Sequence, residues 1–452
     1  MSHENLPLAE KVKKTSARWN PLRKIDTLGQ FDFNTCVVML DSLEAHNVQG
    51  ISLADLESEK KFDLMSYARY AKALVLAVHE YTHFVDSTST LWGLRHLRTL
   101  NSAFTCELTD ESKFHVMRTC YNHLKRIKLP DYYTTVTKEY DTGRPWQWRP
   151  TSGKQFRHDG KPGERPIFFI RFFNERWEPI VRSPISTISL LETCAMAAEL
   201  DATASLIKRI EDEGERTVQT KLHEKETMEY LYNENHTEYS VCAHLVANRF
   251  NSSEASISFL ASSIIARVVL NSSESVYRSI LRNIQTFYDV VGLRNGQPEA
   301  KPIRRGLENY DPGVLFYVLC MSMDRNSLDN LQSFGLSLVT TLLRFGIHYE
   351  KDYEATALVE GASIAVKLQS SPNKTIVSMA AAGFHNLTYT LGNYGAMNLQ
   401  HMNLPPVLLG DSATHHFHDV EKNSLSNIDV DKSYYEMLEG QLQMELFGDA
   451  CI

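Results

Sequence analysis

The chain has 452 residues, of which 43% are hydrophobic and 23% charged, which is ordinary usage for a globular protein. Its formal net charge of −8 argues against nucleic acid as a partner, because such binding depends on clustered lysine and arginine. A chain of this length can bury a substantial core without disulfides or structural metals. We therefore expect any metal that it binds to serve chemistry rather than to hold the fold together.

The cysteines and the N-terminus indicate a cytoplasmic protein. Seven cysteines occur, none in a C-x-x-C pair, and the odd number argues against a fully bridged secreted scaffold. We expect reduced and mostly buried thiols. Residues 1–19 are polar and charged and lack the apolar stretch of a signal peptide. Apolar runs such as residues 313–323 are too short to cross a bilayer, so no membrane contact is expected.

The N-terminal part, residues 1–185, is predicted to be a mixed α/β region. Residues 31–40 are rich in aromatic and β-branched residues, which is typical of a strand. From about residue 59 to 88, apolar residues recur at helical spacing and predict a long helix. Residues 143–166 are crowded with Gly, Pro, Trp, Arg and Lys and are predicted to be a basic insertion loop. Residues 167–185 favour a strand pair with a turn near its middle.

The C-terminal part, residues 186–452, consists mainly of helical patterns. Ser189 and Glu192 have the spacing of a capping box, although the first helix of this part could also start at Ser186. Together the two parts predict an α+β protein that is predominantly α-helical, with a small β-sheet and a large helical C-terminal part.

The predicted helix at residues 59–88 contains the sequence His79-Glu80-Tyr81-Thr82-His83. Residues four apart lie on one face of a helix, so His79 and His83 can offer two imidazole nitrogens to one ion. Glu80 can reach a water bound to that ion, and zinc lowers the pKa of such a water to roughly 7. The alternative is a buried helix whose two histidines donate hydrogen bonds to neighbouring carbonyls.

This motif resembles the active-site helix of the zincin metallopeptidases. The metzincin branch has a glycine and a third histidine after the motif, where this chain has Asp86 and Ser89, so that branch does not fit. The inverted order H-x-x-E-H is also absent. What remains is similar to the gluzincin type, in which a glutamate from a later helix is the third ligand. The resemblance implies a zincin-like core, one Zn²⁺ per chain, and peptide-bond hydrolysis with Glu80 as general base.

Two glutamates are candidates for the third ligand. Glu192 lies in a helical segment that follows the predicted strand pair, and Glu360 lies in a segment of similar form. Small residues one turn along either segment would let its helix pack closely on the motif helix. We prefer Glu192 and keep Glu360 as the alternative. Asp86 and Glu199, and also Asp201, could orient a ligating imidazole through its second nitrogen.

A peptidase also needs a hydrogen-bond donor for the developing oxyanion. The Gly- and Asn-containing segment 384–402 suggests a shaped loop over a cleft. It offers four candidate donors, which are His385, Tyr389, Tyr394 and His401. The His415–His418 tract, in contrast, is interpreted as a surface loop.

The functional hypothesis is a zinc-dependent metallopeptidase that acts on a peptide or protein. The predicted strand at residues 31–40 could pair with an extended substrate. Two alternatives remain open. The chain could be a non-enzymatic helical interaction or regulatory protein whose motif is vestigial or arose by chance. It could also be a zinc hydrolase that acts on a non-peptide amide or ester.

Overall fold

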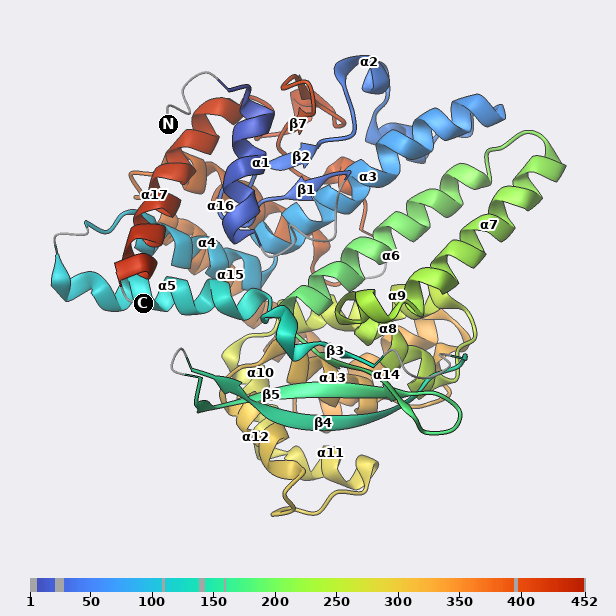
Figure 1. Cartoon of the computed structure of the whole chain (residues 1–452), viewed down its shortest axis with the longest axis vertical. Helices are drawn as coiled ribbons and strands as arrows, with labels where there is room; N and C mark the ends of the chain where they lie inside the picture. The colour runs from blue at the N-terminus through green and yellow to red at the C-terminus, as the bar shows by residue number, and fades with distance from the viewer. Residues whose placement is uncertain are drawn as a thin grey trace. The chain divides into compact units, whose positions relative to one another are not determined.

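The described part of the chain is predominantly helical and contains two small β-sheets, consistent with the predicted α+β class (Figure 1). The computed structural model describes residues 6–20, 28–107, 110–137, 143–157, 160–393 and 397–450. The chain forms two compact units, whose segments alternate along the sequence. Unit 1 comprises Met1–Leu124, Ala195–His223 and Leu358–Ile452, and unit 2 comprises Lys125–Cys194 and Glu224–Ala357. The predicted division at residue 185 therefore differs from the observed one.

Unit 1 contains a four-stranded sheet in the order β1-β2-β7-β8. Its strands are β1 (Gln30–Phe31), β2 (Val38–Leu40), β7 (Val407–Leu409) and β8 (Thr414–His415). Strand β2 pairs in parallel with β7, whereas the two outer pairs are antiparallel. The helices of this unit are α1 (Leu8–Trp19), α2 (Ala45–Val48), α3 (Leu64–Thr88), α4 (Leu91–Phe104), α16 (Lys374–Thr390) and α17 (Val430–Ala450), with most of α5 (Phe114–Ile127).

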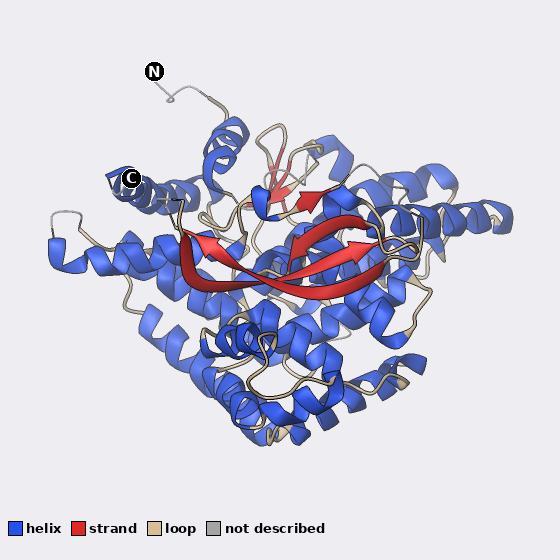
Figure 2. Cartoon of the chain, turned by 60° about the horizontal axis from the view of Figure 1, so that its bottom comes forward, coloured by secondary structure: helices blue, strands red, loops and turns tan. Residues whose placement is uncertain are grey.

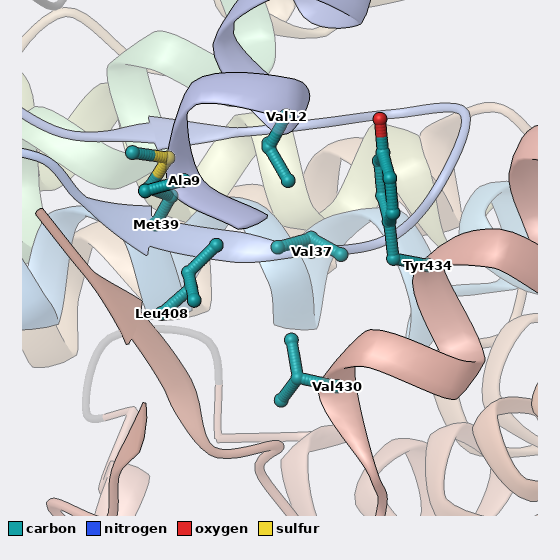
Figure 3. Close-up of a cluster of buried hydrophobic side chains, with 7 residues drawn as sticks. All are labelled: Ala9, Val12, Val37, Met39, Leu408, Val430 and Tyr434. Carbon is teal, nitrogen blue, oxygen red and sulfur yellow. The ribbon is translucent and has the colours of Figure 1, made fainter. Parts of the chain in front are cut away.

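The two ends of the chain share one hydrophobic cluster in unit 1 (Figure 3). Helix α1 and strand β2 bring residues from the N-terminal end, and strand β7 and helix α17 bring residues from the C-terminal end. The cluster consists of Ala9, Val12, Val37, Met39, Leu408, Val430 and Tyr434, all of them buried. Burial of these apolar side chains favours the parallel pairing of β2 with β7.

Unit 2 contains an antiparallel sheet in the order β3-β6-β5-β4, whose long strands are visibly twisted in Figure 2. Its strands are β3 (Thr135–Val136), β4 (Gln147–Phe156), β5 (Pro162–Phe173) and β6 (Pro179–Pro184). Its helices are α8 (Thr237–Phe250), α9 (Ala255–Leu270), α10 (Glu274–Arg282), α11 (Ile284–Val291), α12 (Ala300–Glu308), α13 (Pro312–Ser322) and α14 (Leu331–Arg344). Helices α6 (Thr187–Ile207), α7 (Glu213–Leu231) and α15 (Ala355–Leu368) contribute residues to both units.

Short helical turns connect several of these elements. Seven of those in the described ranges are 3-10 turns, namely Leu53–Leu56, Glu111–Lys113, Asp131–Tyr133, Glu234–His236, Ser327–Asp329, Leu399–His401 and Val420–Lys422, and Tyr349–Glu354 forms a π-helix.

Two predicted elements of the N-terminal part are wrong. The insertion loop predicted at residues 143–166 is mostly strand, because β4 and the beginning of β5 form a long hairpin. The single strand predicted at residues 31–40 is instead a hairpin of β1 and β2. Its turn is built around Asp32, whose Oδ1 atom accepts hydrogen bonds from the backbone N–H groups of Asn34 and Thr35. The strand pair predicted at residues 167–185 is confirmed by the pairing of β5 with β6.

Six cysteines lie in the described part of the chain, and all six are buried free thiols, as expected. Cys451 lies outside the described residues. Within the described ranges, no single helix is both long enough and apolar enough to cross a membrane. Helices Glu234–Phe250 and Ala255–Leu270 meet that test only together, and they are bent by 105° at the break between them.

Candidate metal centre

Helix α3 carries the His79–His83 motif in its buried C-terminal half. The helix begins after Asp63, whose carboxylate accepts a hydrogen bond from the Ser66 N–H at 2.6 Å and so caps the first turn. Every residue from 77 to 88 is buried. A glycine at position 383 allows α16 to pack closely here, because a Cβ atom there would overlap with the Thr88 carbonyl group. The motif therefore lies inside unit 1 rather than on a solvated helix face.

The two motif histidines face each other across one helical turn. The Nε2 atom of His79 lies 3.2 Å from the Nε2 atom of His83. At this distance, a proton or a cation must lie between two nitrogen lone pairs that point toward one another. Two imidazole nitrogens bound to a tetrahedral zinc, each about 2.0–2.1 Å from the ion, lie about 3.3 Å apart. The separation of the two nitrogens thus fits a shared metal ion.

A glutamate from α6 completes a group of three residues that could hold a metal ion. The potential ligand atoms of His79, His83 and Glu192 all lie within 4.8 Å of one another, and all three residues are buried. The Glu192 carboxylate and the His83 ring are fully buried, and His79 is 5% exposed. Two neutral nitrogens and one carboxylate oxygen form a donor set suited to zinc.

The protonation of both imidazoles is consistent with metal binding. Burial and the neighbouring His79 lower the pKa of His83 well below its usual value, so His83 is neutral at physiological pH. The Nδ1 atom of His79 lies 2.8 Å from the Oε2 atom of Glu199, and a proton on Nδ1 would be donated to this carboxylate. That tautomer leaves Nε2 of His79 as an acceptor that faces His83.

The structure therefore brings Glu199 to the motif, in the position expected of a residue that orients a ligand imidazole. The Glu199 side chain is 32% exposed, so solvent reaches part of it. Asp86 is buried on α3, one turn beyond His83. Asp201 is exposed.

Glu80, which follows His79 on α3, is fully buried. A Cβ atom added at Gly29 would lie 2.9 Å from Oε1 of Glu80 and 3.1 Å from Cδ1 of Leu76. The backbone that leads into strand β1 therefore lies directly against the Glu80 side chain. Glycine at position 29 keeps this space open, and nothing in the local sequence around it predicts the contact.

Helix α6 starts earlier than the predicted capping box at Ser189 and Glu192. It begins at Thr187, and the Ser186 N–H donates a hydrogen bond to Oγ of Ser189 at 3.1 Å. The hydroxyl of Ser186 donates to Oε1 of Glu238 on α8 at 3.0 Å. Glu192 therefore lies beyond the first turn of α6, where its carboxylate has no capping role.

The alternative ligand Glu360 is not part of the group of three. Its carboxylate accepts two hydrogen bonds from the Arg95 guanidinium, at 2.7 Å to Oε1 and 2.8 Å to Oε2. This bidentate ion pair joins α15 to α4 and gives Glu360 a structural partner. The sequence favoured Glu192 over Glu360, but nothing in it predicted the contact of Glu360 with Arg95.

The candidate oxyanion donors lie on exposed segments. His385 and Tyr389 are exposed on α16, and His401 is exposed in the turn Leu399–His401. The Nδ1 atom of His385 is 2.9 Å from Nδ2 of Asn403, and the Tyr389 and His401 rings are 5.6 Å apart. None of these three belongs to the group of potential metal ligands. Tyr394 lies outside the described residues.

A contact that the sequence did not predict ties the start of α3 to the end of α6. Phe62 and Ile210 form a parallel β-bridge, and the Arg209 guanidinium lies 3.9 Å above the Phe62 ring. Arg209 also donates to the carbonyl groups of Lys60, at 2.8 Å, and Asp55. From this bridge, α3 runs toward His79 as α6 runs back toward Glu199, so the two helices are antiparallel where they meet.

The His415–His418 tract is more buried than the predicted surface loop. His418 is buried, and burial lowers its pKa to about 4. Phe417 is fully buried, and its ring lies 6.5 Å from that of Tyr81 in an edge-on contact. The Tyr81 hydroxyl donates to the Pro405 carbonyl at 2.9 Å. The segment after α16 thus packs on the motif helix and helps to fix it.

No family model, curated protein or solved structure matches the chain. It is a predominantly helical α+β protein with a buried group of two histidines and one glutamate that could hold a metal ion.

Proposed function

We propose that the chain is a zinc-dependent hydrolase, and that its substrate bond is a peptide bond. The observation that carries this proposal is the position of Glu80, next to His79 on the turn that presents two imidazole nitrogens 3.2 Å apart. The residue types and their order are those that zinc-dependent peptide hydrolysis requires. A zincin-like core is part of the same proposal.

The chemistry assigns a role to each residue. A zinc ion bound to His79, His83 and Glu192 would polarise the substrate carbonyl and lower the pKa of a bound water. Glu80 takes a proton from the attacking water and passes it to the leaving amine. Glu199 holds the Nδ1 proton of His79 and so keeps the Nε2 atom directed toward the ligand group.

Strand β1 supports a peptide as the substrate. It lies at the end of the sheet order β1-β2-β7-β8, and the residue before it contacts the Glu80 side chain. An extended peptide can add to such an edge through backbone hydrogen bonds. The carbonyl group of Phe31 already accepts a hydrogen bond from Asn20 at 2.8 Å, so residues 28–30, the described residues directly before Phe31, are the proposed pairing segment.

Zinc content and hydrolysis of a fluorescein-labelled unfolded protein test the proposal together. Wild type should contain about one zinc per chain. His83→Ala and Glu192→Ala should lose it, whereas Glu360→Ala, the matched control, should keep it. Glu80→Gln should also keep the zinc and lose activity by roughly a hundredfold or more.

Each contrary result has a distinct meaning. Zinc retained in Glu192→Ala and lost in Glu360→Ala would reassign the third ligand. Full hydrolysis by Glu80→Gln would remove the general base from the mechanism. Hydrolysis of esters or small amides but not of peptides would favour the non-peptide hydrolase. Wild type without zinc, even after zinc is supplied, would favour the non-enzymatic interaction protein.

A further inference from the structure

Three arginines form a row across the sheet of unit 2. Arg149 on β4 pairs with Arg171 on β5, which in turn pairs with Arg182 on β6. Directly opposed residues of antiparallel strands point to the same face, with Cβ atoms about 4.5–5.5 Å apart. Arg149 and Arg171 are exposed, and Arg182 is half-buried. Three guanidinium groups therefore emerge side by side from one face.

Within the described ranges, no carboxylate forms an ion pair with any of these three arginines. Among the residues that the structure describes, the row makes one hydrogen bond to a side chain, a long one from Arg182 to Oγ1 of Thr135 at 3.4 Å. The rows on either side carry no charge, since they consist of Thr151, Phe169 and Pro184, and of Gln147, Phe173 and Pro179. Like charges placed directly opposite each other destabilise a sheet, so the three arginines lower the stability of the fold. The fold itself does not require them at these positions.

Two aromatic rings hold the outer arginines in place. The guanidinium carbon of Arg149 lies 4.3 Å from the centre of the Trp177 ring, and that of Arg182 lies 4.6 Å from the Phe169 ring. Such cation–π contacts restrict a guanidinium group and leave the N–H donors at its rim available. Those donors match the planar, bidentate geometry of a carboxylate. The row is thus arranged in advance for several carboxylates.

We propose that this face binds an acidic peptide segment. The row spans two strand spacings of about 4.8 Å, or roughly 10 Å, which about three residues of extended chain also span. A run of three or four Asp or Glu residues therefore matches it in length and charge. A nucleic-acid strand fits less well, because it needs open aromatic faces for base stacking, whereas guanidinium groups lie over Trp177 and Phe169. This inference does not depend on the metal centre.

Fluorescence anisotropy with the full-length protein tests the proposal. The probe is a fluorescein-labelled peptide with six consecutive glutamates, beside the same peptide with six glutamines. Wild type should bind the glutamate peptide and not the glutamine peptide, and the affinity should fall as salt is added. The triple variant Arg149→Gln, Arg171→Gln and Arg182→Gln should bind about tenfold more weakly or worse.

The matched control also removes three positive charges, but from helices and loops of unit 2. Arg278, Arg294 and Arg304 are exposed and lie outside the sheet, and their triple change to Gln should alter binding less than about twofold. Equal losses in the two triple variants would reduce the effect to net charge and overturn the proposal. A second result would also overturn the proposal. If wild type bound a twelve-nucleotide oligothymidylate more tightly than the glutamate peptide, and the sheet variant lost that binding, the face would be a nucleic-acid surface.

A stability measurement separates a binding role from a structural one. Arg171 is the central arginine and has like charges on both sides. Arg171→Thr should therefore raise the midpoint of thermal unfolding while it weakens binding of the glutamate peptide. A lower midpoint would show that Arg171 serves the fold, and the proposal would then fail.

Discussion

The Nδ1 atom of His79 on helix α3 lies 2.8 Å from the Oε2 atom of Glu199 on helix α6. Glu192, on the same helix as Glu199, lies in the group of potential metal ligands with His79 and His83. Helix α6 therefore supplies both the proposed third ligand, Glu192, and the carboxylate of Glu199 that would orient the imidazole of His79. A change in the orientation of α6 would affect both contacts.

Replacing Glu199 with Gln should weaken zinc binding by roughly tenfold, because a neutral amide holds the Nδ1 proton of His79 less strongly than a carboxylate does. The fold should be unaffected, since the Glu199 side chain is partly exposed. Competition with a zinc chelator gives the affinity. Asp201→Asn is the control, because Asp201 is exposed on the same helix. Equal zinc affinities in wild type and Glu199→Gln would remove Glu199 from the centre.

Gly29→Ala should reduce hydrolysis by roughly tenfold or more and leave the zinc content unchanged. The added Cβ atom would lie 2.9 Å from Oε1 of Glu80, and a general base displaced by a fraction of an ångström loses much of its effect. Gly335→Ala is a suitable control, because nothing lies within 4 Å of a Cβ atom at that position. Activity and zinc content measured on the same preparations separate displacement of Glu80 from loss of the metal.

Arg209→Met should destabilise the protein by about 1–3 kcal/mol, because it removes hydrogen bonds from a charged group to two backbone carbonyl groups. Zinc affinity should fall as well, since the bridge between Phe62 and Ile210 ties the start of α3 to the end of α6. Urea unfolding gives the free energy of unfolding. Lys208→Met changes an exposed neighbour and should have little effect on either quantity.

Glu238 should make stability depend on pH. Burial raises the pKa of its carboxyl group from 4.5 to about 7 in the folded protein. Between these values the folded state binds more protons than the unfolded state, so stability falls as the pH rises from about 4.5 to about 7. Glu238→Gln lacks this penalty.

Wild type and Glu238→Gln should therefore have similar stability near pH 4.5, with the variant more stable at pH 8 by on the order of 3 kcal/mol. Urea unfolding at the two pH values, with a chelator present so that metal binding does not contribute, measures the difference. If the difference in stability between wild type and Glu238→Gln does not change with pH, Glu238 is ionised in the folded state at both pH values.

Local patterns in the sequence predicted the parts of the site that depend on one helix. The apolar spacing of α3 is a property of that segment alone, so the helix and the pairing of His79 with His83 followed from it. The position of Glu192 after the predicted strand pair favoured it over Glu360, whose segment has a similar form, but the ion pair of Glu360 with Arg95 was not predicted. The contact between Glu360 and Arg95 joins residues far apart in the sequence, so it could not be predicted from local residue spacing.

The errors have a similar physical origin. Strand β4 contains Pro150, Gly153 and several charged residues, a composition that favours a loop when read locally. It becomes a strand because β5 supplies a hydrogen-bonding partner along almost its whole length. The arrangement of the two units is also non-local, because unit 1 is assembled from three separated segments, and no boundary signal marks where the chain leaves one unit and enters the other.

The pairing of β2 with β7 has a consequence for how the protein is made. Synthesis on the ribosome proceeds from the N-terminus, and folding of a nascent chain can use only the segments that have already emerged. Strand β2 emerges before any part of unit 2, but its parallel partner begins at Val407. All of unit 2 emerges before that point. Completion of unit 1 must therefore wait until β7 has emerged, and a chain released before Val407 keeps β2 without its parallel partner.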